Sequence, residues 1–287
     1  MEVGPAQAAS RLPPHAYFLV SAVFHYLGPA FAVLLFARVD VLGVAWLRIA
    51  SAAAVFAAWR RPWRLWLSLS WRDRRLLVAL GAVLGVMNAC FYEAIARLPL
   101  ATVGAIEFLG PIALALWGTR SRRNGVAVAL AAGGVYLLTG FRLGGQALGV
   151  ALALANCAFF VLYILLAHRI AQRGAGGGID GLGASMLLAL LLVTPVGLAG
   201  ALPAVTSPLL LGAGVGVGIC SSVIPYVTDQ LAMARLSRGT YALLLSLLPA
   251  AAACIGVVVL RQVPTIADLA GIALVVVGIA VHREQPS

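Results

Sequence analysis

Charge is the scarcest property of this sequence. Only 10% of its 287 residues are charged, whereas 62% are hydrophobic, and the mean hydropathy is +1.02. A chain with so few polar residues cannot cover a water-exposed surface, which excludes an ordinary soluble domain. We therefore expect most of its surface to face lipid.

Lysine is absent, and all twenty basic residues are arginine, which we attribute to codon composition and not to chemistry. The formal net charge of +11 does not indicate a nucleic-acid partner, because the arginines are scattered through short loops between apolar runs. Such scattering is typical of membrane topology. We expect the partners to be a lipid bilayer and a small molecule.

Motifs that would support enzyme chemistry are also missing. The four cysteines lie in apolar runs without a CxxC pair, and the sequence has no GxSxG, HExxH or carboxylate cluster. The glycine-rich stretch GAGVGVG, residues 212–218, follows no strand, so its Gly212/Gly216 and Gly214/Gly218 pairs predict close helix packing and not a phosphate loop. We expect no enzymatic activity, no cofactor and no metal centre.

Hydropathy divides the chain into apolar runs long enough to cross a bilayer, for which a helix needs about 20 residues. The sequence predicts ten such spans, at 16–36, 40–59, 76–96, 99–118, 124–140, 146–167, 181–201, 209–233, 240–260 and 265–281. The first run is interpreted as a membrane span and not as a cleaved signal peptide. The predicted class is an all-α polytopic membrane protein.

The arginines predict the orientation of the spans. With the N-terminus in the cytoplasm, fifteen arginines fall in inside loops and four in outside loops, and Arg48 lies within a span. This bias predicts an inner-membrane protein with both termini cytoplasmic.

An internal repeat divides the spans into two sets of five. Residues 96–111, ARLPLATVGAIEFLGP, align with residues 234–249, ARLSRGTYALLLSLLP. Because five is odd, the second copy enters the membrane inverted, which is typical of secondary transporters that work by alternating access. We expect a cytoplasmic segment at 1–15, repeats at 16–140 and 146–282, a linker at 141–145 and a cytoplasmic tail at 283–287.

Two charges lie at equal depth in the predicted spans. Arg48 and Glu107 are each the ninth residue from the outer end of a span. Ionisable groups inside a membrane are costly and commonly functional. Two interpretations follow: the pair holds two helices together, or Arg48 meets a substrate carboxylate while Glu107 meets an amine or carries a proton.

Four prolines and six further polar residues also lie inside the predicted spans. A proline inside a helix removes the hydrogen bond to the carbonyl four residues earlier, as Pro111 does for Glu107 and Pro225 for Ser221. Pro29 and Pro249 extend this set of candidate helix breaks, although each could also be a simple packing kink. Further candidates for binding substrate are His25, Asn88, Tyr92, Asn156, Tyr163 and Tyr226, each of which could instead serve only interhelical packing.

The stretch MNACFYEAIARLPLATVGAIEFLGPIALAL, residues 87–116, resembles the drug/metabolite transporter superfamily, EamA type, and is most similar to its threonine/homoserine exporter subgroup. LRIA at 47–50, GVALALANCAFFVLYIL at 149–165 and IPYVTDQLAMARL at 224–236 match in order. The resemblance implies ten helices in an inverted repeat, export of small amino acids, and proton coupling or exchange. It departs from the subgroup at Leu248 and at Arg261 with Gln262, where such exporters commonly carry carboxylates.

We therefore expect a secondary transporter that exports a threonine- or homoserine-like amino acid. The alternatives are an exporter of an aromatic amino acid, a nucleoside or a cationic compound, and a non-transporting membrane sensor.

Overall fold

Helices account for the secondary structure throughout the described residues of the chain, which are 13–118, 122–139, 143–172, 178–233, 235–236, 244 and 247–281 of a computed structural model. They are α2 (Pro14–Leu35), α3 (Val41–Arg60), α4 (Trp63–Ser68), α5 (Trp71–Ile95), α6 (Leu100–Gly118), α7 (Arg122–Thr139), α8 (Leu143–Gln172), α9 (Ile179–Val205), α10 (Pro208–Gly218), the π-helix η1 (Ile219–Val223), α11 (Ile224–Met233), α13 (Leu248–Leu260) and α14 (Ile266–Val281).

Most helix bounds agree with the hydropathy prediction to within a few residues. The largest differences are at α5, which begins at Trp71, and at α8, which continues to Gln172. In the ninth predicted span, α13 begins at Leu248, and residues 240–243 and 245–246 lie outside the described part of the chain. The short helix α4 was not predicted.

Local sequence signals explain several helix ends. The Asp40 side chain accepts a hydrogen bond from the Leu42 amide and so caps α3. At the start of α5 the Ser70 hydroxyl accepts from the Asp73 amide and donates to the Asp73 carboxylate, and beside α14 Thr265 and Asp268 form a reciprocal capping pair. Apolar composition fixes the interiors of the helices, whereas short polar side chains fix where they begin.

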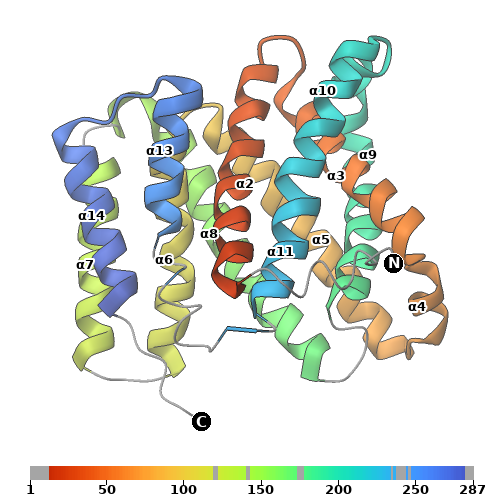
Figure 1. The fold of residues 1–287 in the computed structure, drawn as a ribbon, viewed down its shortest axis with the longest axis horizontal. Helices are drawn as coiled ribbons and strands as arrows, with labels where there is room; N and C mark the ends of the chain where they lie inside the picture. Colours follow the sequence, from red (N-terminus) through yellow and green to blue (C-terminus); the bar gives the residue numbers. More distant parts are fainter. Residues whose placement is uncertain are drawn as a thin grey trace.

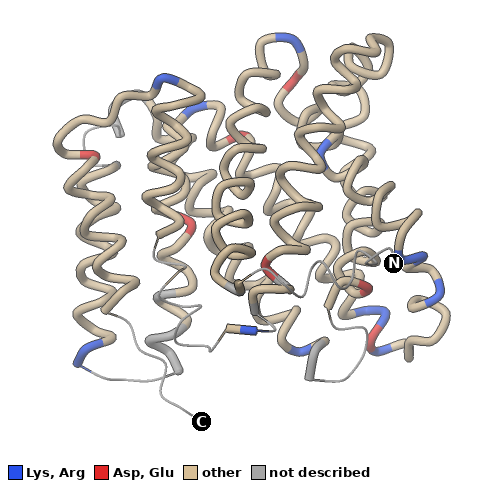
Figure 2. The backbone as a smooth tube through the Cα atoms, in the orientation of Figure 1, with Lys and Arg blue, Asp and Glu red and all other residues tan. Residues whose placement is uncertain are grey.

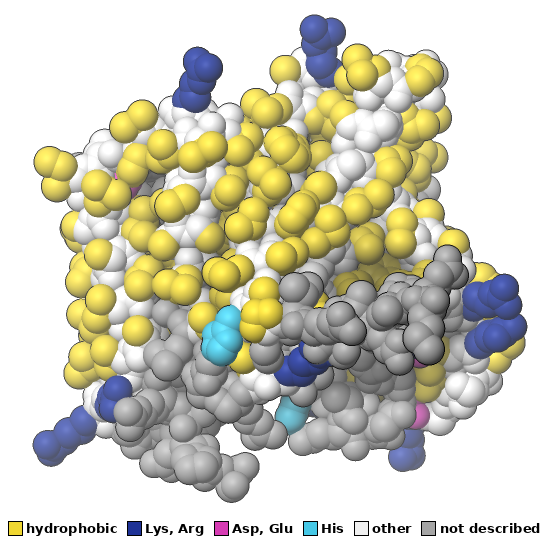
Figure 3. Space-filling model, in the orientation of Figure 1, with side chains coloured by type: hydrophobic (Ala, Val, Ile, Leu, Met, Phe, Trp, Pro, Cys, Tyr) yellow, Lys and Arg dark blue, Asp and Glu magenta, His cyan; other side chains and the backbone are white. Residues whose placement is uncertain are grey.

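The helices stand roughly side by side as a bundle (Figure 1). Helix α3 packs along α9, α7 along α14, α5 along α8, α2 along α11, and α6 along α13. Charged residues lie mainly near the two ends of the bundle, with a few in its middle (Figure 2). Hydrophobic side chains cover much of the visible face between these ends (Figure 3).

Membrane insertion follows from this surface. Among the described residues, six helices are long and apolar enough to cross a membrane, and three shorter apolar helices accompany them. Exposed leucines such as Leu191 and Leu209 lie on these helices, where lipid is the matching environment. The protein is an all-helical membrane protein.

Only part of the glycine-packing prediction is confirmed. A Cβ at Gly214 would lie 2.8 Å from Leu47 Cδ1, and one at Gly218 would lie 1.8 Å from Ser51 Oγ, so both glycines face α3 at close range. At Gly212 and Gly216 a Cβ would meet nothing within 4 Å. The prediction was wrong for Gly212 and Gly216, because none of the described helices packs against that face of α10.

Candidate functional site

Buried and half-buried polar side chains from helices far apart in the sequence meet in the apolar interior. Arg48 comes from α3, Tyr92 from α5, Glu107 from α6, Asn156 from α8 and Tyr226 from α11. Arg48 and Glu107 are each only 7% exposed. Tyr226 lies within electrostatic range of Arg48, Glu107 and Tyr92, which joins the contributions of four helices, and Asn156 adds α8 through its hydrogen bond to Glu107.

Arg48 is bound to the second half of the chain. Its Nε donates to Ser222 Oγ at 2.9 Å, and its Nη2 donates to the Ser221 carbonyl at 3.1 Å. Its guanidinium carbon also lies 5.4 Å from the centre of the Tyr92 ring, a cation–π contact. These contacts leave Nη1 without a hydrogen bond among the described residues.

The Ser221 carbonyl accepts from Arg48 where the helix has changed its pattern. Ser221 belongs to the π-helical turn η1, and Pro225 four residues later has no amide hydrogen to offer. The sequence predicted that this carbonyl would be free to face another group. In the structure that group is the Arg48 side chain.

Close packing between α3 and η1 makes this contact possible. A Cβ at Gly218 would lie 2.7 Å from the Arg48 carbonyl, and one at Gly28 of α2 would lie 2.2 Å from Ser221 Oγ. Ser21 on α2 also donates to the Pro225 carbonyl at 3.3 Å. The π-helical turn is therefore held between α2 and α3.

Glu107 has a different partner. Asn156 Nδ2 donates to Glu107 Oε1 at 3.1 Å, whereas Glu107 Oε2 is buried and has no hydrogen-bond partner in the described part of the chain. Arg48 interacts with Glu107 electrostatically but forms no ion pair with it, whereas ion pairs elsewhere in the described residues include Arg60–Asp180 and Arg97–Glu93. The direct Arg48–Glu107 pair that the sequence allowed is not formed.

Several residues near Glu107 or near Arg48 carry buried polar atoms that lack a hydrogen-bond partner in the described part of the chain. Within the described residues, buried side-chain atoms without a hydrogen-bond partner include Glu107 Oε2, Asn156 Oδ1, and the hydroxyls of Tyr26, Tyr92 and Ser221. Because an unpaired buried polar group costs about 1 to 3 kcal/mol, such a concentration calls for a ligand or water. We call these five residues, together with Arg48, which contacts Ser221 and Tyr92, the central polar cluster.

Tyr26 and the Ser221 hydroxyl were not predicted from the sequence. Tyr26 is fully buried, its hydroxyl would lie 3.0 Å from a Cβ at Gly104, and it lies within electrostatic range of Glu107. Tyr26 could have been recognised in the sequence because it lies just before Gly28 and Pro29, and a hydroxyl-bearing ring beside a helix break is a candidate for binding.

The other predicted residues lie at varying distance from the cluster. His25 is within electrostatic range of Arg48 and makes an edge contact with Tyr26. Tyr163 stacks on Phe160 and lies within electrostatic range of Tyr226 and Asp229. Asn88 donates to the Leu84 carbonyl of its own helix at 2.7 Å, so the structure gives it no hydrogen bond to the cluster.

The four prolines occupy two kinds of position. Pro29 and Pro111 lie inside α2 and α6, and Pro225 follows the π-helical turn. Pro249 lies in the first turn of α13, where a proline is readily accommodated. The residue whose carbonyl it was expected to free, Leu245, lies outside the described part of the chain.

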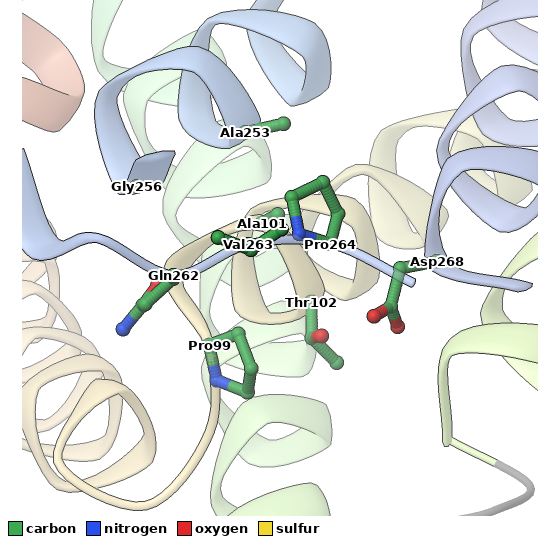
Figure 4. A pocket seen from close by; sticks show the side chains of 9 residues that line it. All are labelled: Pro99, Ala101, Thr102, Ala253, Gly256, Gln262, Val263, Pro264 and Asp268. Carbon is green, nitrogen blue, oxygen red and sulfur yellow. The ribbon is translucent and has the colours of Figure 1, made fainter. Parts of the chain in front are cut away.

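A small pocket lies away from the cluster, where α6 begins and α13 leads to α14 (Figure 4). Its cavity of about 40 Å³ suits water molecules and not an amino acid. Gln262 Oε1 accepts from the Leu100 amide, and Asp268 accepts from Thr265, so these polar groups cap helices.

Within the described residues no group of three or more His, Cys, Asp or Glu side chains could hold a metal ion.

Comparison with known proteins gives consistent results. Residues 147–282 match the model of the EamA-like transporter family. The chain is 33% identical over 270 residues to the threonine/homoserine exporter RhtA of Escherichia coli K12, covering 92% of this chain and 88% of that one. It is 34% identical over 245 residues to the protein of the same name from Salmonella typhimurium SL1344, covering 83% and 80%.

The fold also has a counterpart among solved structures. One crystal structure matches with a TM-score of 0.62 over 93% of this chain and 96% of the other, at 20% sequence identity. At this identity the likeness concerns the fold alone.

Proposed function

The chain belongs to the EamA-like transporter family, and on this premise we propose that it exports small amino acids of the threonine or homoserine kind. The observation that carries the proposal is a buried carboxylate with one oxygen unpartnered, Glu107 Oε2, in a cluster that also holds a guanidinium. A zwitterion has one group for each of these charges.

The ammonium end of the substrate fits beside Glu107. Because the Asn156 amide nitrogen already donates to Glu107, its Oδ1 is left as a second unpartnered acceptor. A primary ammonium has three hydrogens, which Glu107 Oε2, Asn156 Oδ1 and the Tyr26 hydroxyl oxygen can accept. We propose that these three atoms recognise the substrate amine.

The carboxylate end of the substrate fits beside Arg48. Its Nη1 is available to a carboxylate oxygen while Nε and Nη2 hold the π-helical turn. A carboxylate that binds bidentately would compete with the Ser221 carbonyl for Nη2. We propose that this competition links substrate binding to movement of α10 and α11 against α3, with Tyr92 and Tyr226 lining the site.

Alternating access would use two inverted repeats of five helices, residues 16–140 and 146–282, joined by a linker at 141–145. The packing of the helices supports this arrangement. In chain order, α2, α3, α5, α6 and α7 of the first repeat correspond to α8, α9, α10 with α11, α13 and α14 of the second. The packed pairs α3·α9, α6·α13 and α7·α14 each join corresponding helices, and the pair α2·α11 corresponds to the pair α5·α8. A two-fold relation between repeats produces this pattern of pairs.

Pro29, Pro111 and Pro225 would serve as the breaks about which the helices bend.

The arginine bias supports an inner-membrane location with both termini cytoplasmic. Glu107 is the carboxylate in the cluster able to accept either a substrate amine or a proton, so proton coupling or exchange would pass through it.

A cationic compound without a carboxylate is the second candidate substrate. It is favoured by one observation: two of the three guanidinium nitrogens of Arg48 are already bound to protein, whereas Glu107 keeps a free oxygen. Such a substrate would need the Glu107 end of the cluster alone.

Counterflow in proteoliposomes tests the proposal. Proteoliposomes are loaded with unlabelled threonine, homoserine, an aromatic amino acid, a nucleoside or a cationic dye, and uptake of the same compound in labelled form is compared, with and without a pH gradient. We expect threonine and homoserine to exchange fastest. Exchange confined to the cationic dye would favour the second candidate, and no exchange of any compound would contradict transport.

A further inference from the structure

The segment between α3 and α5 concentrates arginine and tryptophan at one corner of the molecule. Residues 59–75, WRRPWRLWLSLSWRDRR, contain six arginines and four tryptophans against one acidic residue, Asp73. The segment includes α4 and lies at the lower right of the bundle, where positive charge gathers in the tube and space-filling views (Figures 2 and 3). We call residues 59–75 the Arg–Trp surface.

Two of the arginines have partners in the protein: Arg60 binds the body of the protein, and Arg74 binds residues of the segment itself. Arg60 donates through Nε and Nη2 to the Asp180 carboxylate of α9, at 2.6 and 3.0 Å. Arg74 donates to the carbonyls of Trp66 and Leu67, at 3.1 and 3.3 Å, and lies over the Trp66 ring at 5.5 Å. The segment is therefore a fixed surface.

The other four arginines have no such role. The side chains of Arg61, Arg64, Arg72 and Arg75 are exposed and have no hydrogen-bond or ion-pair partner within the described residues. Arg61 ends α3 with a φ of 49°, a left-handed conformation that favours glycine. Arg72 lies in the first turn of α5, where the helix dipole disfavours positive charge. The fold alone does not account for these positions.

The tryptophans fix the depth of the surface in the membrane. Trp59, Trp63 and Trp71 are 53%, 49% and 71% exposed. Both flanking helices, α3 and α5, are candidate membrane spans that end at this segment. Exposed indole rings at the end of a span favour the level of the lipid headgroups. The unpartnered guanidinium groups therefore lie where phosphate groups are found.

We propose that the Arg–Trp surface binds the headgroups of anionic phospholipids. The guanidinium groups of Arg61, Arg64, Arg72 and Arg75 donate hydrogen bonds to phosphate oxygens, while the exposed tryptophan rings rest among the upper acyl chains. The occupant follows from charge complementarity: a net positive, hydrogen-bond-donating surface at headgroup depth matches a negatively charged lipid better than a zwitterionic one. This binding does not depend on which substrate is transported.

Tryptophan fluorescence provides the test, since four of the six tryptophans lie on this surface. The full chain is reconstituted in bilayers that contain acyl-brominated phosphatidylglycerol or acyl-brominated phosphatidylcholine, and quenching gives their relative binding constants. We expect about a fivefold preference for the anionic lipid, the factor that corresponds to one arginine at an anionic surface. Equal quenching by the two lipids would overturn the proposal.

Matched variants identify the residues responsible. We expect Arg61→Gly/Arg64→Gln/Arg72→Gln/Arg75→Gln to bring the preference close to one, and substitution of all four by lysine to retain most of it. The control Arg38→Gln/Arg261→Gly changes two exposed arginines at the opposite end of the bundle, including the other left-handed arginine at a helix end, and should keep the full preference.

The double variant Arg64→Gln/Arg75→Gln guards against misfolding, because both side chains are exposed and bound to no described residue. It should lower the preference by itself. The assignment would be contradicted if the fourfold variant kept its preference for the anionic lipid. It would also be contradicted if the Arg38/Arg261 control lost as much of that preference as the fourfold variant.

Discussion

Replacing Gly218 with alanine tests the packing that brings Arg48 to the π-helical turn. The added methyl group would lie 1.8 Å from Ser51 Oγ and 2.7 Å from the Arg48 carbonyl. The first contact is far inside van der Waals distance, and the second is with backbone that cannot rotate away. Either α10 must move from α3, or Ser51 must give up its hydrogen bond to the Leu47 carbonyl.

The expected cost follows from two opposing effects. Overpacking of this kind destabilises a protein by about 1 to 3 kcal/mol, and two severe contacts favour the upper end. Alanine is a better helix former than glycine by about 1 kcal/mol, which partly offsets that cost. We therefore expect Gly218→Ala to lower the free energy of unfolding by about 2 kcal/mol.

Gly212→Ala is the matched control, because a Cβ there meets nothing within 4 Å on the same helix. It should be neutral or raise stability by up to about 1 kcal/mol. Both variants are compared with the parent by unfolding in mixed detergent micelles. Equal stability of the two alanine variants would show that α3 and α10 are not in close contact, and would remove the basis for the contact between Arg48 and Ser221.

Three further substitutions separate binding from stability. Tyr26→Phe should raise the KM for threonine about fivefold, because one hydrogen bond of about 1 kcal/mol to the substrate is lost, and should leave stability unchanged. An unaltered KM would remove Tyr26 from the site. Thr194→Val removes the acceptor of Trp46 Nε1 and should cost about 1 to 3 kcal/mol of stability without changing transport per folded molecule, as measured by micelle unfolding and counterflow. Gln262→Leu leaves the Leu100 amide uncapped and should cost about 0.5 to 2 kcal/mol in the same unfolding assay; no change would mean that the cap is not made.

The helices could be predicted from the sequence because lipid imposes a simple rule on length and composition. Runs such as 181–201 have only one environment that suits them, so their helical state follows without knowledge of their neighbours. The helix α4 escaped this rule, because its six residues are short and lie among arginines and tryptophans. The π-helical turn was not predicted either, because apolar composition does not distinguish a π-helical turn from an α-helical one.

The candidate site was partly visible for a related reason. Arg48 and Glu107 stood out because charge is rare in a membrane span, and the shared depth of the two residues followed from counting along their spans. Their partners did not follow, because Asn156 and Ser222 take up the hydrogen bonds that a direct pair would have used. Tyr26 was missed because a tyrosine in an apolar run looks like packing until its hydroxyl is found without a partner.

The central claim is that the unpartnered oxygen of Glu107 receives the substrate amine, and threonine counterflow by two glutamine variants tests it most directly. Glu107→Gln removes the buried negative charge, whereas Glu93→Gln removes a carboxylate that pairs with Arg97 at the end of α5. We predict that Glu107→Gln lowers the counterflow rate at least about a hundredfold, as expected for loss of a buried charged partner, and that Glu93→Gln stays near the parent rate. A Glu107→Gln protein that exchanges threonine at the parent rate would contradict the account.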